Sequence, residues 1–117
     1  MHSHSRDYWR AMQALVVEAQ IVIDRPRGQP HPRYPELIYP FDYGYIEGTT
    51  AADGAGIDIW LGSQSERTLS GLVCTFDRNK RDAEIKLLVG CSVQDVEIIL
   101  QFQRSLTHCL YIPRGDT

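Results

Sequence analysis

Four aspartates at the ends of apolar segments are the residues best suited to chemistry in this chain. They form two closely spaced pairs, Asp53 with Asp58 and Asp77 with Asp82. If both pairs lie at one end of a sheet, the carboxylates converge, and their mutual repulsion favours a bound divalent cation. Hard oxygen ligands favour Mg²⁺, or Mn²⁺, over zinc. The alternative is that each is a solvated turn residue, since turns favour aspartate for local hydrogen-bonding reasons.

A polar face accompanies the second pair. Asp82, Glu84 and Lys86 alternate with apolar residues along 82–89. In a strand, this alternation places the three polar side chains on one face. That face either lines a cavity or faces solvent, as is common in antiparallel sheets.

Residues 25–40 form a proline-rich segment that also carries cations. Its five prolines fix the backbone and remove amide donors, which excludes a helix or a central strand and predicts a stiff, extended loop. Arg27 and Arg33 suit phosphate, because a guanidinium matches phosphate oxygens in a fork. Carboxylates for metal ions beside arginines for phosphate are an arrangement for phosphoryl transfer. Nearby tyrosines can supply a hydroxyl, although such residues more often pack: Tyr34, Tyr39, Tyr43 and Tyr45.

The elements that must position these residues follow from hydrophobic periodicity. Residues 6–16 predict a helix, with Trp9, Met12, Leu15 and Val16 on one face. Strands are predicted at 20–24, 42–47, 57–61, 68–76 and 82–89, with a short one at 110–112. A second helix begins at Ser92, whose hydroxyl caps the first turn, with Asp95 three residues on. Residues 1–5 are expected to be a loose tail. The pattern predicts one domain over 1–117, mainly β (α+β), built as a small β-barrel with a helix at each end.

Bulk composition restricts the function classes. The net charge of −3 shows no basic excess, so nucleic acid is not expected as a partner. The apolar runs are far too short to span a bilayer, and the first five residues are polar, so we expect a cytoplasmic protein that does not contact a membrane. Three cysteines occur without a Cys-x-x-Cys pair, which favours buried, reduced thiols over zinc or redox chemistry.

Several stretches together resemble a known family. They are Ile21-Val22-Ile23-Asp24, Tyr39-Pro40-Phe41-Asp42-Tyr43-Gly44-Tyr45-Ile46, Thr49, Asp53-Gly54 and Ile57-Asp58. With the spaced pair Asp77 and Asp82, they resemble the core of the soluble inorganic pyrophosphatases over about residues 20–105.

The resemblance implies a fold, a reaction and roles for residues. The fold would be a five-stranded barrel like the oligonucleotide-binding (OB) fold, and the reaction Mg²⁺-dependent hydrolysis of pyrophosphate. The implied metal ligands are Asp53, Asp58, Asp77 and Asp82, with Asp24 where the family has a metal-linked glutamate. Tyr43 matches the family's active-site tyrosine. Tyr43 and Lys86 are therefore the expected catalytic residues, and Arg27, Arg33, Tyr43 and Lys86 the expected substrate contacts. Full-length relatives are often oligomers, so a homo-oligomer is expected.

Departures from the family pattern modify this expectation. Ala55 replaces a second aspartate that helps to activate water, and Glu84 replaces a lysine, with Lys86 one strand pitch later. A positioned base contributes roughly 10²–10⁴ in rate. We therefore expect hydrolysis of pyrophosphate or a related phosphoanhydride that is weak or redirected. The alternative is a catalytically silent module that binds a phosphate or nucleotide ligand. A third possibility is a structural domain of a larger assembly.

Overall fold

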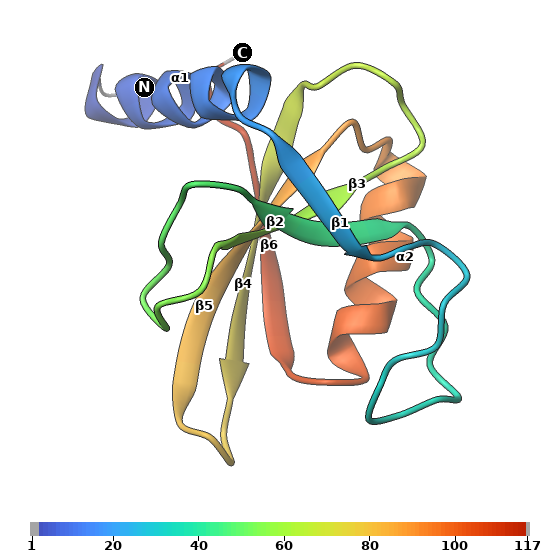
Figure 1. Ribbon diagram of the computed structural model, residues 1–117. Helices are drawn as coiled ribbons and strands as arrows, with labels where there is room; N and C mark the ends of the chain where they lie inside the picture. Colours follow the sequence, from blue (N-terminus) through green and yellow to red (C-terminus); the bar gives the residue numbers. More distant parts are fainter. Residues whose placement is uncertain (1–2, 117) are drawn as a thin grey trace.

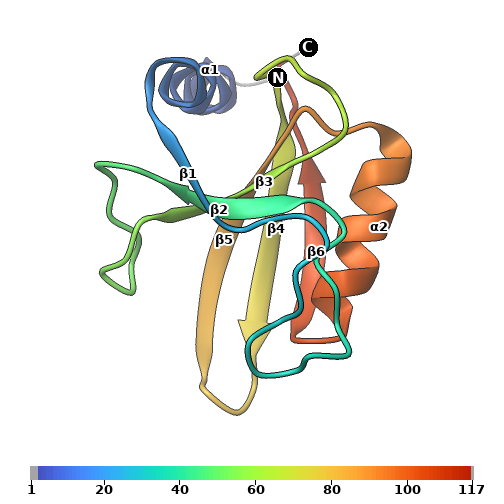
Figure 2. The same cartoon turned by 45° about the vertical axis from the view of Figure 1, so that its right-hand side comes forward.

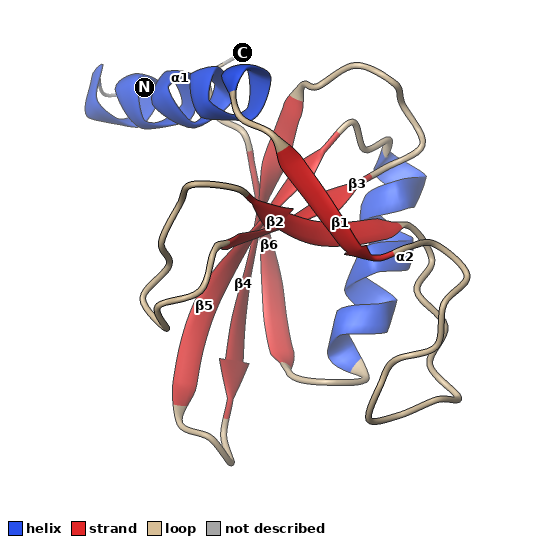
Figure 3. Cartoon of the chain, viewed as in Figure 1, coloured by secondary structure: helices blue, strands red, loops and turns tan. Residues whose placement is uncertain are grey.

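The structure, a computed structural model, describes residues 3–116 and contains two helices and one six-stranded sheet within that range. The helices are α1 (Ser3–Glu18) and α2 (Val93–Arg104), and the strands are β1 (Ile21–Arg25), β2 (Asp42–Ile46), β3 (Ile57–Leu61), β4 (Leu69–Asp77), β5 (Asp82–Val89) and β6 (His108–Pro113) (Figures 1 and 3). The fold is mainly β within the α+β class, as the sequence pattern predicted.

The sheet is open and mixed, so the prediction of a closed five-stranded, OB-like barrel is wrong. The strand order is β1-β2-β3-β5-β4-β6, in which β3 and β5 are parallel and the other neighbours antiparallel. The physical reason lies in β6, which is longer than the predicted strand at 110–112 and pairs along β4 from Gly71 to Phe76. Because β5 and β6 occupy both edges of β4, no edge of β4 is left with which β1 could close a barrel.

Helix α1 begins before the predicted residue 6. Residues Ser3 to Ser5 are helical, so the prediction of a loose tail is wrong for them, and residues 1–2 lie outside the described part of the chain. Trp9 and Val16, two turns apart, are its buried residues. Figure 1 shows α1 lying across one end of the sheet, while α2 runs alongside the strands. Neither helix in the described range is long and apolar enough to cross a membrane.

Two hydrophobic clusters hold the layers together. The α1 cluster joins Trp9 and Val16 to strand residues such as Ile59 and Leu87. The α2 cluster is a second group: Tyr39, Phe41, Trp60, Val73, Leu88, Val96, Ile99, Leu100 and Phe102. Successive residues of one strand, such as Ile59 and Trp60, thus pack on opposite faces of the sheet.

The predicted cap of α2 is confirmed. The Ser92 side chain accepts a hydrogen bond from the Asp95 backbone N–H at 3.1 Å, and Asp95 Oδ2 accepts from the Ser92 backbone N–H at 3.0 Å. The same carboxylate oxygen accepts from the backbone N–H and hydroxyl of Ser63 at 2.8 and 2.6 Å. Asp95 therefore ties the start of α2 to the segment after β3, and it is only 5% exposed.

Gly44 is required where β1 and β2 approach each other. It lies opposite Ile23 in the antiparallel register. A Cβ at this position would stand 1.8 Å from the carbonyl oxygen of Val22. The glycine between Tyr43 and Tyr45 is therefore explained by backbone packing alone.

Candidate functional site

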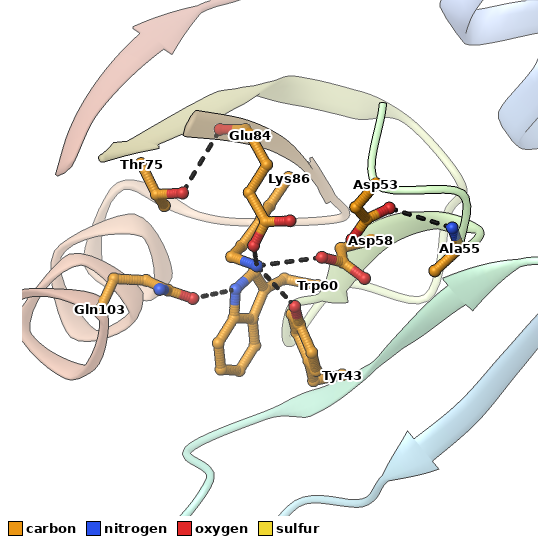
Figure 4. Close-up of polar contacts among 9 residues, drawn as sticks. All are labelled: Tyr43, Asp53, Ala55, Asp58, Trp60, Thr75, Glu84, Lys86 and Gln103. Atoms are coloured by element: carbon orange, nitrogen blue, oxygen red, sulfur yellow. Dashed lines mark hydrogen bonds and ion pairs between the residues drawn. The ribbon is translucent and has the colours of Figure 1, made fainter. Parts of the chain in front are cut away.

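The side chain of Lys86 lies at the centre of a polar cluster on three neighbouring strands (Figure 4). Its Nζ donates to Tyr43 Oη at 2.7 Å, to Asp58 Oδ2 at 3.0 Å and to Glu84 Oε1 at 2.9 Å. Lys86 is only 6% exposed. We refer to these four residues as the Lys86 cluster.

Strand register explains how the cluster forms. Asp58 on β3 is the parallel partner of Lys86 on β5, so their side chains lie side by side on the same face. Glu84 precedes Lys86 by two residues and shares that face, as the alternation along β5 predicted. Tyr43 comes from β2, where it pairs with Trp60 and lies against that ring at a centroid distance of 4.7 Å.

The cluster is arranged to keep a charged lysine next to a neutral phenol. Burial opposes the ammonium charge of Lys86, but its interactions with Tyr43, Asp58 and Glu84 outweigh burial and raise its pKa. Burial also raises the pKa of Tyr43, against the effect of Lys86. Tyr43 therefore keeps its proton at neutral pH and acts as a hydrogen-bond partner. An ammonium group has three N–H donors, and Tyr43, Asp58 and Glu84 occupy all of them.

An open cleft of about 330 Å³ lies beside the cluster. It is bounded by the proline-rich loop, strands β4 and β5 with their hairpin turn, and the end of α2. The proline-rich loop, the β4–β5 hairpin turn and the C-terminal end of α2 lie toward the lower end of the molecule in two views (Figures 1 and 2). Its lining residues are His31, Arg33, Tyr34, Tyr39, Tyr43, Thr75, Asp77, Lys80, Glu84, Lys86, Phe102, Gln103, Leu106 and Thr107.

The proline-rich loop folds back on itself, which is more compact than the extended loop that the sequence predicted. Tyr39 N–H donates to Gln29 O and Gly28 N–H to Tyr39 O, both at 2.9 Å, and Pro30 forms a bridge with Ile38. These bonds hold the aromatic and cationic side chains of the loop against the cleft.

His31 organises the tip of this loop. Its Nδ1 accepts from the backbone N–H groups of Arg33 and Tyr34 at 3.1 and 3.2 Å, which requires an unprotonated Nδ1. Burial, reinforced by Arg25 and Arg33, lowers the pKa of His31. The neutral imidazole is thus the form that fits this turn.

The cleft collects some of the predicted site residues and leaves others outside. Arg33, Tyr43, Asp77 and Lys86 all line it. Arg27 is not among the lining residues, and its guanidinium lies over the Phe41 ring, 5.6 Å from the centroid.

Asp24 also lies outside the cleft. It is exposed on β1, an edge strand, at an irregularity in the pairing with β2.

The four predicted metal-binding aspartates do not meet at one point. Asp58 is held by Lys86, while Asp53 Oδ1 accepts from Ala55 N–H at 3.0 Å. Asp77 Oδ1 accepts from the N–H groups of Asn79 and Lys80 at 2.9 and 3.1 Å. Asp53 and Asp77 thus accept hydrogen bonds within their own turns, as expected if they are turn residues and not metal ligands. Within residues 3–116, no three carboxylate, imidazole or thiol groups are close enough to hold a metal ion.

Two of these aspartates are nevertheless neighbours. Asp77 and Asp82 are directly opposite each other at the end of the β4–β5 hairpin. Mg²⁺ is usually held by one or two carboxylates together with substrate phosphates and water. These two carboxylates offer ligands of the kind that such a metal takes, although they supply no complete cage and only Asp77 of the two lines the cleft.

Comparison with known proteins gives no assignment. No protein-family model matches the sequence, and a search of curated proteins finds no match. The resemblance to soluble pyrophosphatases therefore rests on the motifs in the sequence.

Sequence reasoning missed several cleft residues. Gln103 continues the apolar stripe of α2 and carries no motif, yet its Oε1 accepts from Trp60 Nε1 at 3.1 Å and it is 3% exposed. Thr107 and Lys80 lie in turns with no distinguishing pattern. By contrast, the alternation along β5 located Glu84 and Lys86 correctly on a shared face.

The cysteines have no role in this site. All three are unpaired and partly buried. Burial, with a contribution from Asp95, raises the pKa of Cys91 to about 12, so this thiol is not a nucleophile at neutral pH.

Proposed function

We propose that this protein binds a small phosphorylated anion, with pyrophosphate as the simplest member, in the cleft beside the Lys86 cluster. The observation that carries the proposal is the buried Lys86 ammonium, which lies in the wall of an open cleft. Because Asp58 and Glu84 already balance this charge, another anion binds the ammonium group by taking the place of one of these carboxylates.

Charges on the cleft walls support an anionic ligand. The lining includes three cations, Arg33, Lys80 and Lys86, and two carboxylates, Asp77 and Glu84, while a third carboxylate, Asp58, pairs with Lys86 from outside the lining. Arg33 comes from the proline-rich loop and Lys80 from the hairpin turn, so the two exposed cations belong to different walls. A guanidinium and an ammonium on separate walls suit a ligand with several phosphate oxygens.

Glu84 is the group that competes with the ligand. Its side chain is 38% exposed while that of Lys86 is 8% exposed, and both residues line the cleft, so the carboxylate is the more accessible member of the pair. Because the three Lys86 donors are already used, a phosphate oxygen reaches Nζ by replacing the Glu84 carboxylate. Binding is then an exchange of one anion for another at the same ammonium group.

The test is calorimetric titration with pyrophosphate in the absence of divalent metal. Glu84→Gln removes the competing charge, so the affinity for pyrophosphate should rise. Because solvent screens a partly exposed carboxylate, we expect a rise of only roughly tenfold. Glu18→Gln, which makes the same change at an exposed residue of α1, should leave the affinity at the wild-type value. No measurable binding in the wild type and in Glu84→Gln would refute the proposal.

Hydrolysis of pyrophosphate or another phosphoanhydride is a second candidate, which the juxtaposition of Asp77 and Asp82 favours. When bound, Mg²⁺ would supply charge neutralisation on the phosphates. Asp82→Asn should then lower the Mg²⁺-dependent release of phosphate by at least about tenfold, as is typical for residues that support a metal. Phosphate release no faster than a protein-free control with Mg²⁺ would exclude hydrolysis and leave the binding proposal in place.

A further inference from the structure

One wall of the cleft is aromatic, which a bare phosphate does not require. Tyr34 lines the cleft and is 43% exposed. Its ring lies 5.4 Å from the His31 ring, and the His31 ring is parallel to the buried Tyr39 ring, with an interplanar angle of 3° at 6.0 Å. Three rings thus lead from the mouth of the cleft into the core.

This wall is held in place before any ligand binds. Leu37 N–H donates to Tyr34 O at 2.9 Å and His31 N–H donates to Leu37 O at 2.8 Å. The His31 imidazole accepts from the Tyr34 backbone N–H, as described above. A ring presented on a braced loop loses little conformational freedom when a ligand stacks on it.

The helix side of the cleft offers hydrogen-bonding groups. Thr107 Oγ1 is buried and has no hydrogen-bond partner among the described residues. Gln103 uses its Oε1 for Trp60, so its amide nitrogen is the group available for donation. Both residues line the cleft. A buried hydroxyl without a partner is costly, and a polar group on a ligand would satisfy it.

We infer that the phosphorylated ligand carries a heteroaromatic ring and is a nucleotide. The ring stacks on Tyr34, its polar edge faces Gln103 and Thr107, and the phosphate lies toward the cations of the cleft. This inference rests on the proposed function, because it names the class of anion that the same cleft takes. Flat rings and phosphates are the two parts of a nucleotide that aromatic and cationic side chains recognise.

The experiment compares two ligands that differ only in the base. Ribose 5-phosphate and adenosine 5′-monophosphate are titrated into the metal-free protein by calorimetry. Stacking of one base on an aromatic side chain is typically worth about 1–3 kcal/mol, so the nucleotide should bind at least roughly fivefold more tightly. Tyr34→Ala should bring the ratio of the two affinities close to one, and Tyr34→Phe, which keeps the ring, should restore it.

A matched control separates stacking from a general loss of stability. Tyr8 on α1 is 45% exposed, close to the 43% of Tyr34, and does not line the cleft. Tyr8→Ala should keep the wild-type ratio.

Three outcomes overturn part or all of this account. Equal affinities of the two ligands for the wild type overturn the nucleotide inference but keep the proposed function. A preference for the nucleotide that persists in Tyr34→Ala overturns the assignment of Tyr34 as the stacking residue. Absence of binding by pyrophosphate and by both organic phosphates refutes the proposed function itself.

Discussion

Replacing Asp58 by asparagine removes one of the two carboxylates that compensate the buried Lys86 ammonium. The Asp58–Lys86 pair has an N–O distance of 3.0 Å, with side chains 27% and 8% exposed. In the variant, Lys86 keeps its charge and retains Glu84 as its single anionic partner. The expected result is a lower free energy of unfolding.

The magnitude follows from the burial of the pair. Removing one partner of a fully buried ion pair costs about 3–5 kcal/mol, and a hydrogen bond to a charged group is worth about 1.5–3 kcal/mol. Because Asp58 is partly exposed and asparagine still offers an oxygen, we expect a loss of about 2 kcal/mol. For a domain of this size, such a loss lowers Tm by roughly 8 °C.

A double-mutant cycle in urea measures the interaction directly. The four proteins are the wild type, Asp58→Asn, Lys86→Met and the double variant. The coupling energy between the two positions should be about 1–2 kcal/mol. If Asp58 is instead a solvated metal ligand, Asp58→Asn should change Mg²⁺ affinity and leave the free energy of unfolding within about 0.5 kcal/mol of wild type. That result would refute the structural role assigned to the pair.

Three further predictions concern the rest of the fold. Because the pKa of His31 is lowered in the folded protein, the neutral imidazole contributes fully to the free energy of unfolding above the ordinary pKa near 6.5, and this contribution is lost as pH falls through the folded-state pKa. NMR titration of the Arg33 and Tyr34 amides should show a midpoint below about pH 6.5, and a higher midpoint would contradict a lowered pKa. Asp95→Ala removes the carboxylate that accepts hydrogen bonds from Ser92 and Ser63, so the free energy of unfolding in urea should fall by roughly 2–3 kcal/mol. A fall under about 0.5 kcal/mol would mean that water takes the place of the carboxylate. Gly44→Ala places a Cβ against the backbone of β1, so the variant should lose the native circular dichroism spectrum or unfold with at least about 3 kcal/mol less stability; near-wild-type stability would show that β1 can move away.

Local rules explain why much of the fold was predictable. The α2 capping box depends on Ser92 and Asp95, three residues apart, and the buried residues of α1 recur at helical spacing. The strand positions followed from short apolar runs. Whether the sheet stays open or closes into a barrel was not predictable from local rules. It depends on how far β6 pairs along β4, and this pairing joins residues that are distant in sequence.

In the candidate site, too, the features set by local sequence were predictable and those set by long-range pairing were not. Alternation along β5 correctly put Glu84 and Lys86 on one face. The choice of Asp58 as a partner for Lys86 comes from the parallel register of β3 and β5, which no local pattern contains. Likewise, the spacing of Asp53 and Asp77 is compatible both with metal ligands and with turn residues, and in the structure each accepts hydrogen bonds from backbone amides of its own turn.

The most direct test of phosphate binding in this cleft is a titration of the ¹⁵N-labelled protein with pyrophosphate, without metal, followed by backbone amide chemical shifts. The largest shifts are expected at the tip of the proline-rich loop, around the β4–β5 turn, and at Glu84, Lys86 and Thr107. A saturable response confined to these residues would support the account. Saturable shifts centred instead on Asp24 and Asp53, or no shifts at millimolar ligand, would contradict it.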